Sequence, residues 1–361
     1  MPTRRLVTSY RQDLRLFPDL WHKVALALGI ALVLAYPFYV GDKWMITGNI
    51  ALVAIVGAVA LMVLTGFAGQ ISLGHAAFLA LGAYTAAVFG NRYHLPYWLL
   101  IPMGGALAAG IGLAIGVFAL RLEGLYLAIV TIGLLFLVNH TLLSFPEYTK
   151  GLTGISVPIH TWFGGDKQSA AAIYEPWNLG PITLTFERKL YFIFLVIAVA
   201  VAFAAKNIQR SNTGRAMAAV RDHDLAASAL GVNPARTKIL AFGISSFIAG
   251  MAGAMYGMQQ QYITVDPFNL NMSVEFIAMI VLGGIGSVFG AIAGAVAFSM
   301  LRPLAEDLGA VLPYIKQLSS AQQSTVLFTI LVVAFLVIEP LGLHGIYLRL
   351  KRYFAAWPFR Y

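Results

Sequence analysis

The stretch from Trp44 to Asn91 contains no Lys, Arg, Asp or Glu. A helix needs roughly 20 apolar residues to cross the hydrocarbon layer of a bilayer, so this stretch can hold two crossings. Glycines and polar residues interrupt it in the middle, from Gly66 to His75. Irregular backbone at membrane depth is tolerated only where protein or a water-filled path surrounds it. The sequence therefore predicts a protein of several membrane spans, whose first interruption is a candidate part of a route for a polar solute.

The composition excludes several other classes of protein. Only 11% of the residues are charged and the mean hydropathy is +0.78, whereas a soluble domain has about 25% charged residues. The net charge is +9, but the positive residues lie in short segments between apolar runs, which favours retention beside membrane spans over nucleic-acid binding. The chain has no Cys, which excludes disulfides and Cys-based metal sites.

Charge-free intervals predict an all-α, polytopic transmembrane helix bundle with glycine-broken helices. We expect about ten spans, because the second interval holds two helices and the run Gly283–Ser287 divides the seventh. The intervals are 24–41, 44–91, 93–120, 124–146, 190–205, 239–265, 276–301 and 317–338.

Lys and Arg are in excess in residues 206–238 and 342–361, whereas residues 147–189 are balanced in charge. The positive-inside rule predicts that the first two segments and the N-terminal segment 1–23 are cytoplasmic, and that loop 147–189 is external. Residues 24–341 would then form the transmembrane domain.

The two glycine breaks, Thr65–Gly69 and Leu282–Gly286, resemble each other, and each leads from an apolar helix into one rich in small residues. Transporters often have such internal symmetry, so we expect two pseudo-repeats, although similar composition alone is the alternative. The glycine ridges Gly253–Gly257 and Gly286–Gly290–Gly294 favour close helix packing within the chain over contact with a second subunit.

Residues 212–231 are rich in alanine and predict a helix, with Asn212 or Thr213 as its cap and Gly231 at its end. The segment is too polar to cross a membrane. A helix across the cytoplasmic mouth that docks on another protein fits this pattern, and so does a solvated helix on the membrane surface.

Three segments resemble the permeases of branched-chain amino-acid ABC importers, the LivH/LivM family. They are Gly69–Phe78 with Gly82–Ala87, Gly214–Gly231 with the small residues 249–254, and Val281–Ser287 with Gly290 and Gly294. The resemblance covers roughly residues 40–340, and the long external loop favours a LivM-type subunit. His223, Asp266 and Ala291 depart from the family pattern, which leaves the substrate open.

The resemblance implies a permease subunit that forms half of a transmembrane path. Its implied companions are a homologous second permease, two cytoplasmic ATPase subunits that bind ATP and Mg, and an extracytoplasmic binding protein, in the bacterial inner (plasma) membrane. The residues implied to couple to the ATPases are Gly214, Arg215, Ala218, Arg221, Asp222, Ala226 and Gly231.

The breaks provide the candidate lining of a substrate path, because polar groups inside membrane spans are functional suspects. The candidates are Gly69, Gln70, Ser72, Gly74, His75, Tyr84, Gly283, Gly284, Gly286 and Gly290. Ser72 and His75 lie three residues apart without a third group to orient a base, so we expect Ser72 to cap a helix and His75 to serve packing rather than catalysis. The sequence has no phosphate-binding loop and no evident metal-ligand cluster, so we expect no catalytic site and no cofactor in this chain.

Branched-chain or related amino acids are the favoured cargo, and urea, amides or aromatic acids are alternatives within the same family. A self-sufficient channel or secondary transporter would need ionisable residues within its spans. Apart from histidines, intervals 44–91, 93–120, 124–146 and 239–265 have none, which favours the ATP-driven importer.

Overall fold

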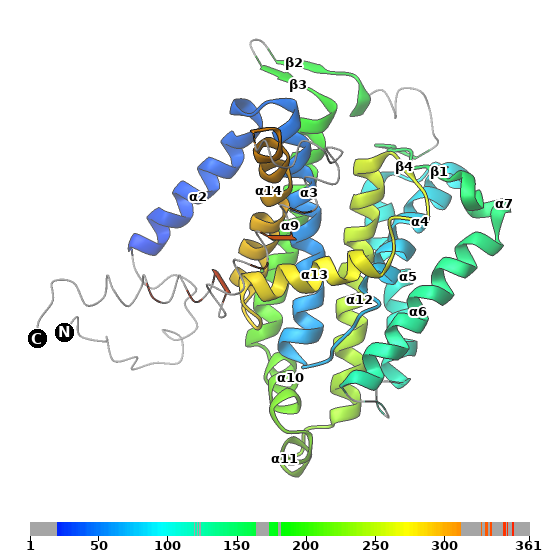
Figure 1. The fold of residues 1–361 in the computed structure, drawn as a ribbon, viewed down its shortest axis with the longest axis vertical. Helices are drawn as coiled ribbons and strands as arrows, with labels where there is room; N and C mark the ends of the chain where they lie inside the picture. The colour runs from blue at the N-terminus through cyan, green and yellow to red at the C-terminus, as the bar shows by residue number, and fades with distance from the viewer. Residues whose placement is uncertain are drawn as a thin grey trace, which may run out of the picture.

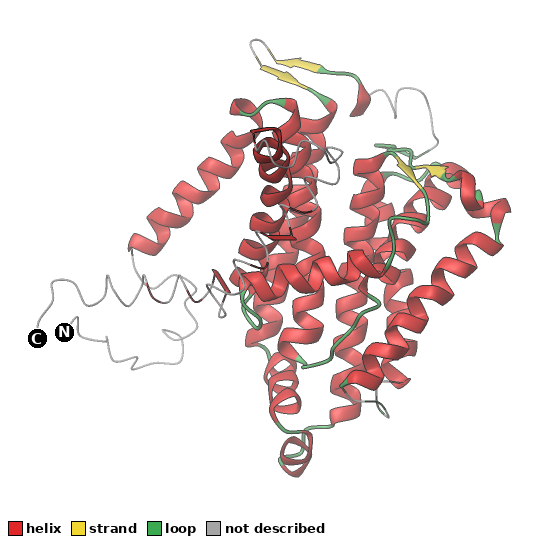
Figure 2. Cartoon of the chain, viewed as in Figure 1, coloured by secondary structure: helices red, strands yellow, loops and turns green. Residues whose placement is uncertain are grey.

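The computed structural model describes residues 20–163 apart from 119, 121 and 123, residues 173–179 and 182–311, and single residues between 326 and 349. Most of the predicted segment 1–23, span 317–338 and tail 342–361 lie outside the described residues. Figure 1 shows a bundle of helices with two small pairs of strands at one end. Figure 2 shows how little strand accompanies the helices, so the predicted all-α bundle is confirmed for the described part of the chain.

Eight longer helices form most of the bundle. They are α2 (Leu20–Tyr39), α3 (Asp42–Leu61), α4 (His75–Tyr93), α5 (Tyr97–Phe118), α6 (Leu125–Ser144), α9 (Phe186–Arg210), α12 (Pro234–Gln260) and α14 (Val288–Val311). The shorter helices are the π-helical turn η1 (Met62–Phe67), α7 (Pro146–Thr149), η2 (Gly151–Thr153), α10 (Asn212–Asp222), α11 (Asp224–Ala229) and α13 (Leu270–Gly283).

The strands pair at one end of the bundle. β1 (Ile155–Ser156) pairs antiparallel with β4 (Tyr262–Ile263), and β2 (Trp177–Leu179) pairs antiparallel with β3 (Ile182–Leu184). We call this end of the bundle the strand end. The opposite end, formed by α10 and α11, we call the α10 end (Figure 1).

Six described helices are long and apolar enough to cross a membrane, namely Asp42–Phe67, Tyr97–Phe118, Leu125–Ser144, Phe186–Arg210, Pro234–Gln260 and Val288–Ala305. The expected count of about ten spans is not confirmed. Interval 44–91 does hold two helices, and interval 276–301 is indeed divided, but α13 has only 14 residues. Such a helix is roughly 21 Å long, whereas the hydrocarbon layer is about 30 Å thick.

Helix α3 is the centre of the bundle. In the most apolar 18-residue stretch of α3 and the turn after it, 89% of the residues are buried. Around it, glycines allow close approach of backbones. A Cβ atom on Gly82 of α4 would overlap the carbonyl oxygen of Gly250 on α12, and one on Gly253 would overlap that of Leu79. The second glycine ridge packs in the same way, since a Cβ atom on Gly283 of α13 would overlap the carbonyl oxygen of Gly290 on α14. Packing within the chain, the favoured interpretation of the ridges, is confirmed at Gly253, Gly290 and Gly294. Gly286 lies before the start of α14, and a Cβ atom there would meet only the Arg221 Nη1, 4.0 Å away.

Helix α13 runs across the middle of the bundle between two groups of roughly upright helices (Figure 1). Its Phe276 side chain packs edge-on against the His75 ring, with 5.0 Å between ring centroids. Its Ser273 hydroxyl accepts a hydrogen bond from the backbone N–H of Ala76, 3.0 Å away, in the first turn of α4. Helix α13, which precedes the second glycine break, thus supports the start of α4, which follows the first break.

Candidate functional site

The first glycine break begins within a π-helical turn that continues α3, Met62–Phe67. Such turns occur often at functional sites. The backbone N–H groups of Gly69 and Gln70 donate to the carbonyl oxygens of Thr65 and Leu64, and the Thr65 hydroxyl donates to the Gln70 carbonyl oxygen at 3.0 Å. Gly69 has a φ of +69°, which favours glycine. The break is therefore a closed, hydrogen-bonded loop.

The second break lies against the first. Gly284 and Gly286 have φ values of +108° and +93°, and the Ser287 hydroxyl then accepts from the N–H of Gly290 to begin α14. A Cβ atom on Gly66 would lie 3.0 Å from the backbone nitrogen of Gly286. Two segments separated by more than 200 positions in the sequence thus meet at the α10 end of the bundle.

The predicted helix over residues 212–231 is present as two helices. At His223 the backbone is extended, with φ −163° and ψ 105°, which separates α10 from α11. The prediction of Asn212 or Thr213 as the cap is wrong, because the Ser211 hydroxyl accepts from the N–H of Gly214. Gly231 follows the last turn with a φ of +84°, the left-handed conformation expected at a helix end.

Arg221, near the end of α10, is hydrogen-bonded to the first break and lies beside the second. Its Nη1 donates to the carbonyl oxygen of Gly66 at 2.8 Å. A Cβ atom on Gly69 would lie 2.6 Å from the Arg221 Cγ, and one on Gly286 would lie 4.0 Å from its Nη1. Asp222 holds the guanidinium from the other side, with 2.9 Å between Oδ1 and both Nε and Nη2. The Arg221 side chain therefore joins α10 to the place where the two breaks meet.

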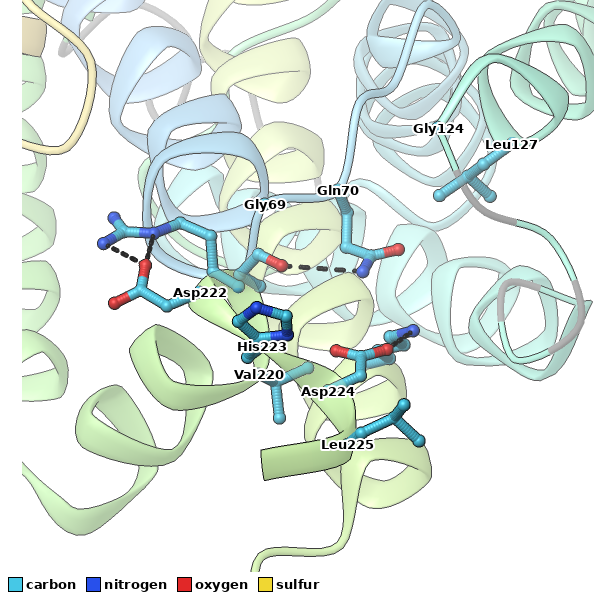
Figure 3. Close-up of a pocket in the computed structure, with 12 residues that line it drawn as sticks. Gly69, Gln70, Gly124, Leu127, Val220, Asp222, His223, Asp224 and Leu225 are labelled. Carbon is cyan, nitrogen blue, oxygen red and sulfur yellow. Dashed lines mark hydrogen bonds and ion pairs between the residues drawn. The ribbon is translucent and has the colours of Figure 1, made fainter. Parts of the chain in front are cut away.

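A cavity of about 350 Å³ opens beside this contact (Figure 3). Figure 3 shows Gly69 and Gln70 of the first break on one side, and Asp222, His223 and Asp224 on the other. Leu127 of α6 and Leu225 of α11 also line it. An ion pair between Asp224 and the buried Lys238 fixes α11 to α12.

The residues implied to couple to ATPases fall into three sets. Gly214 is buried at the corner between α9 and α10, where a Cβ atom would overlap the Ile208 carbonyl oxygen. Arg221 and Asp222 line the cavity. The others lie on the exposed or half-exposed surface of the α10 end, namely Arg215, Ala218, Ala226 and Gly231.

The candidate path residues do not line one cavity. Gly69 and Gln70 line the cavity just described, and Gly284 and Gly286 belong to the break beside it. Gly283 and Gly290 form the contact between α13 and α14. Deeper in the bundle lie Gly74, against Thr131 of α6, and the buried residues Ser72, His75 and Tyr84.

Ser72 does not cap α4, so that prediction is wrong. Its buried hydroxyl has no hydrogen-bond partner among the described residues, and Gly74 occupies the cap position. The His75 Nε2 lies 3.0 Å from the carbonyl oxygen of Gly57 on α3. Ser273, which does bond the start of α4, was missed because nothing in the local sequence links it to a helix nearly 200 positions away.

Ser72 and His75 form no hydrogen bond with each other among the described residues. Within the same part of the chain, no three His, Asp or Glu side chains lie close enough together to hold a metal ion.

Comparison with known proteins identifies the family to which the chain belongs. Residues 43–338 match the family model described as branched-chain amino acid transport system / permease component. No solved structure matches the chain.

Three relatives illustrate the range of similarity. The high-affinity branched-chain amino acid transport system permease protein LivM of Escherichia coli (strain K12) is 34% identical over 79% of this chain and 69% of its own length. The corresponding LivH protein of Salmonella typhimurium is 26% identical over 78% of this chain and 87% of its own. The autoinducer 2 import system permease protein LsrC of Enterobacter sp. (strain 638) is 29% identical over 57% of this chain and 54% of its own length. The chain belongs to the family of permease components of branched-chain amino acid transport systems.

Proposed function

We propose that this chain is one of two permease subunits of an ATP-binding-cassette importer in the bacterial inner membrane. The α10 end would face the cytoplasm, and two separate ATPase subunits would dock there. Those subunits would bind ATP and Mg. A binding protein would deliver solute to the strand end. The names of the relatives support a branched-chain amino acid as cargo and a homologous second permease as companion.

The position of Arg221, which is hydrogen-bonded to the first glycine break and lies beside the second, is the observation on which the mechanism depends. A partner can drive a conformational change only through a difference in its interaction with the two states. Movement of an ATPase against the exposed surface of α10 and α11 would shift Arg221, and with it the carbonyl of Gly66 and the loop beside Gly286. The breaks are the parts of the described bundle best able to change conformation, because their glycines already occupy left-handed φ values.

The test is Arg221→Ala in the complete importer reconstituted in proteoliposomes, with ATP hydrolysis and leucine uptake measured together. We expect hydrolysis to continue while uptake per ATP falls by at least about tenfold, since a charge-assisted hydrogen bond and the packing over Gly69 are lost. Arg236→Ala removes an exposed cation at the same end and serves as the control. Equal uptake per ATP in both variants would contradict the proposed role of Arg221.

A further inference from the structure

Three polar side chains from three helices meet at the strand end. Asn49 lies near the start of α3, Glu187 in the first turn of α9 and Gln259 in the last turn of α12. The Asn49 Nδ2 donates to the Glu187 Oε2 at 2.8 Å and to its backbone carbonyl oxygen at 3.1 Å. The Gln259 Nε2 donates to the same Oε2 at 2.9 Å.

The carboxylate fixes the direction of both amides. A carboxylate only accepts hydrogen bonds, so each amide must turn its NH₂ group toward Glu187 and its carbonyl oxygen away. Asn49 is fully buried and Gln259 is 9% exposed, and the Asn49 Oδ1 and Gln259 Oε1 have no hydrogen-bond partner among the described residues. Leaving such a buried acceptor unfilled is unfavourable, because its hydration is lost and no hydrogen bond replaces it. The cluster therefore offers two unfilled oxygens next to a carboxylate.

The charge of this cluster also lacks a counter-charge among the residues that the structure describes. Glu187 forms no ion pair within the described part of the chain. Three acceptor groups, one of them a carboxylate, call for a donor with a positive charge. A primary ammonium group has three N–H donors and one positive charge, which matches two amide oxygens and one carboxylate.

We propose that Asn49, Glu187 and Gln259 form an acceptor site for the α-ammonium group of the transported amino acid. The inference rests on the proposed function, which makes the strand end the entrance. A solute released there would exchange the hydration of its ammonium group for these three acceptors, while its apolar side chain stays outside the cluster. The same contacts tie α3, α9 and α12 together, so the site would sense the solute at the junction of three helices.

The test measures ligand binding to the permease pair with its ATPase subunits in nanodiscs, without the binding protein. Saturation-transfer NMR detects weak binding of three probes: L-leucine, 3-methylbutylammonium, which lacks the carboxylate, and 4-methylpentanoate, which lacks the ammonium group. We expect the two ammonium compounds to bind. Glu187→Gln and Gln259→Leu should weaken both by at least about tenfold, because a charge-assisted interaction is lost.

Two controls lie at the same end of the molecule. Glu147→Gln removes an exposed carboxylate, and Gln260→Leu changes the exposed neighbour of Gln259 in the same way. Toward each of the three probes, both variants should behave as the parent chain does. Glu187→Gln keeps an acceptor for both amides, so the connection between the helices persists in it, and it decides the question alone if Gln259→Leu fails to fold.

Unchanged binding of the ammonium probes in Glu187→Gln would overturn the proposal, because the cluster would then be a structural connection only. An equal loss for 4-methylpentanoate would overturn it as well. Absence of ammonium binding to a parent complex that still takes up leucine in proteoliposomes would refute the site but leave the proposed function intact. Absence of ATP-driven uptake with every companion present would instead refute the proposed function.

Discussion

Gly82 and Gly250 show how single residues set the spacing of this bundle. Apolar side chains gain little by leaving lipid for a helix interface, so helices in a membrane associate largely through close packing. At Gly82 that packing leaves no room for even one carbon, since the obstacle is the backbone of α12 rather than a side chain that could turn aside.

Gly82→Ala should therefore separate α4 from α12 and lower the free energy of unfolding by about 1–3 kcal/mol, the usual cost of overpacking. Unfolding of the purified protein in detergent by heat or denaturant measures the change. The matched control is Gly110→Ala on α5, where a Cβ atom would have nothing within 4 Å. There the helix should gain up to about 1 kcal/mol. Similar changes in both variants would show that the α4–α12 approach is not tightly packed.

Arg221 illustrates what the sequence could and could not predict at the residue scale. The resemblance to permeases identified it as a coupling residue together with six others. Nothing in the sequence distinguished it from Arg215, which is exposed. Among the described residues, the Arg215 guanidinium bonds only its near neighbours in the chain, Asn212 and the Arg210 carbonyl. What distinguishes Arg221 is its hydrogen bond to the carbonyl oxygen of Gly66, a residue 155 positions away in the chain.

At the scale of helices, charge-free intervals predicted most elements because lipid excludes charge from nearly every turn. They failed at α13, whose length is limited by its position across the bundle rather than by a bilayer crossing. The prediction of one helix over the alanine-rich residues 212–231 failed for a different reason. Alanine favours helix throughout, so composition could not reveal the extended residue His223 that divides α10 from α11.

The substitution Ser273→Ala tests the hydrogen bond between the Ser273 hydroxyl of α13 and the first turn of α4. This change leaves the backbone N–H of Ala76 without an acceptor in a buried first turn, so we expect a loss of about 1–2 kcal/mol in the free energy of unfolding. Ser273→Thr retains the hydroxyl and should recover most of the loss. As a control, Ser228→Ala on α11 removes an exposed hydroxyl that bonds only the Leu225 carbonyl, and stability should not change. Equal stability of the Ser273→Ala and Ser228→Ala variants would contradict this role of Ser273.

At the scale of the whole molecule, α3 with its π-helical turn connects the two candidate sites. It has Asn49 near its start and Gly66 near its end, and its 26 residues extend over roughly 39 Å. Since the helix is surrounded by protein for most of this length, a displacement at Gly66 cannot be absorbed by lipid and must move its neighbours. The proposed ammonium site and the Arg221 contact thus share one rigid element.

If ATP-driven movement of α10 and α11 reshapes the cavity at the α10 end, fixing its walls should stop transport. Leu127 and Leu225 lie on different walls of this cavity (Figure 3), and the chain has no Cys of its own, so two introduced cysteines would react alone. We expect Leu127→Cys with Leu225→Cys, joined by a reducible bis-maleimide, to lose ATP-driven uptake in proteoliposomes and to regain it after the linker is reduced. Each single-cysteine variant, treated with the same reagent, should retain uptake. Full activity of the linked protein would mean that the cavity keeps its shape throughout the cycle, and the movement would have to be sought elsewhere in the bundle.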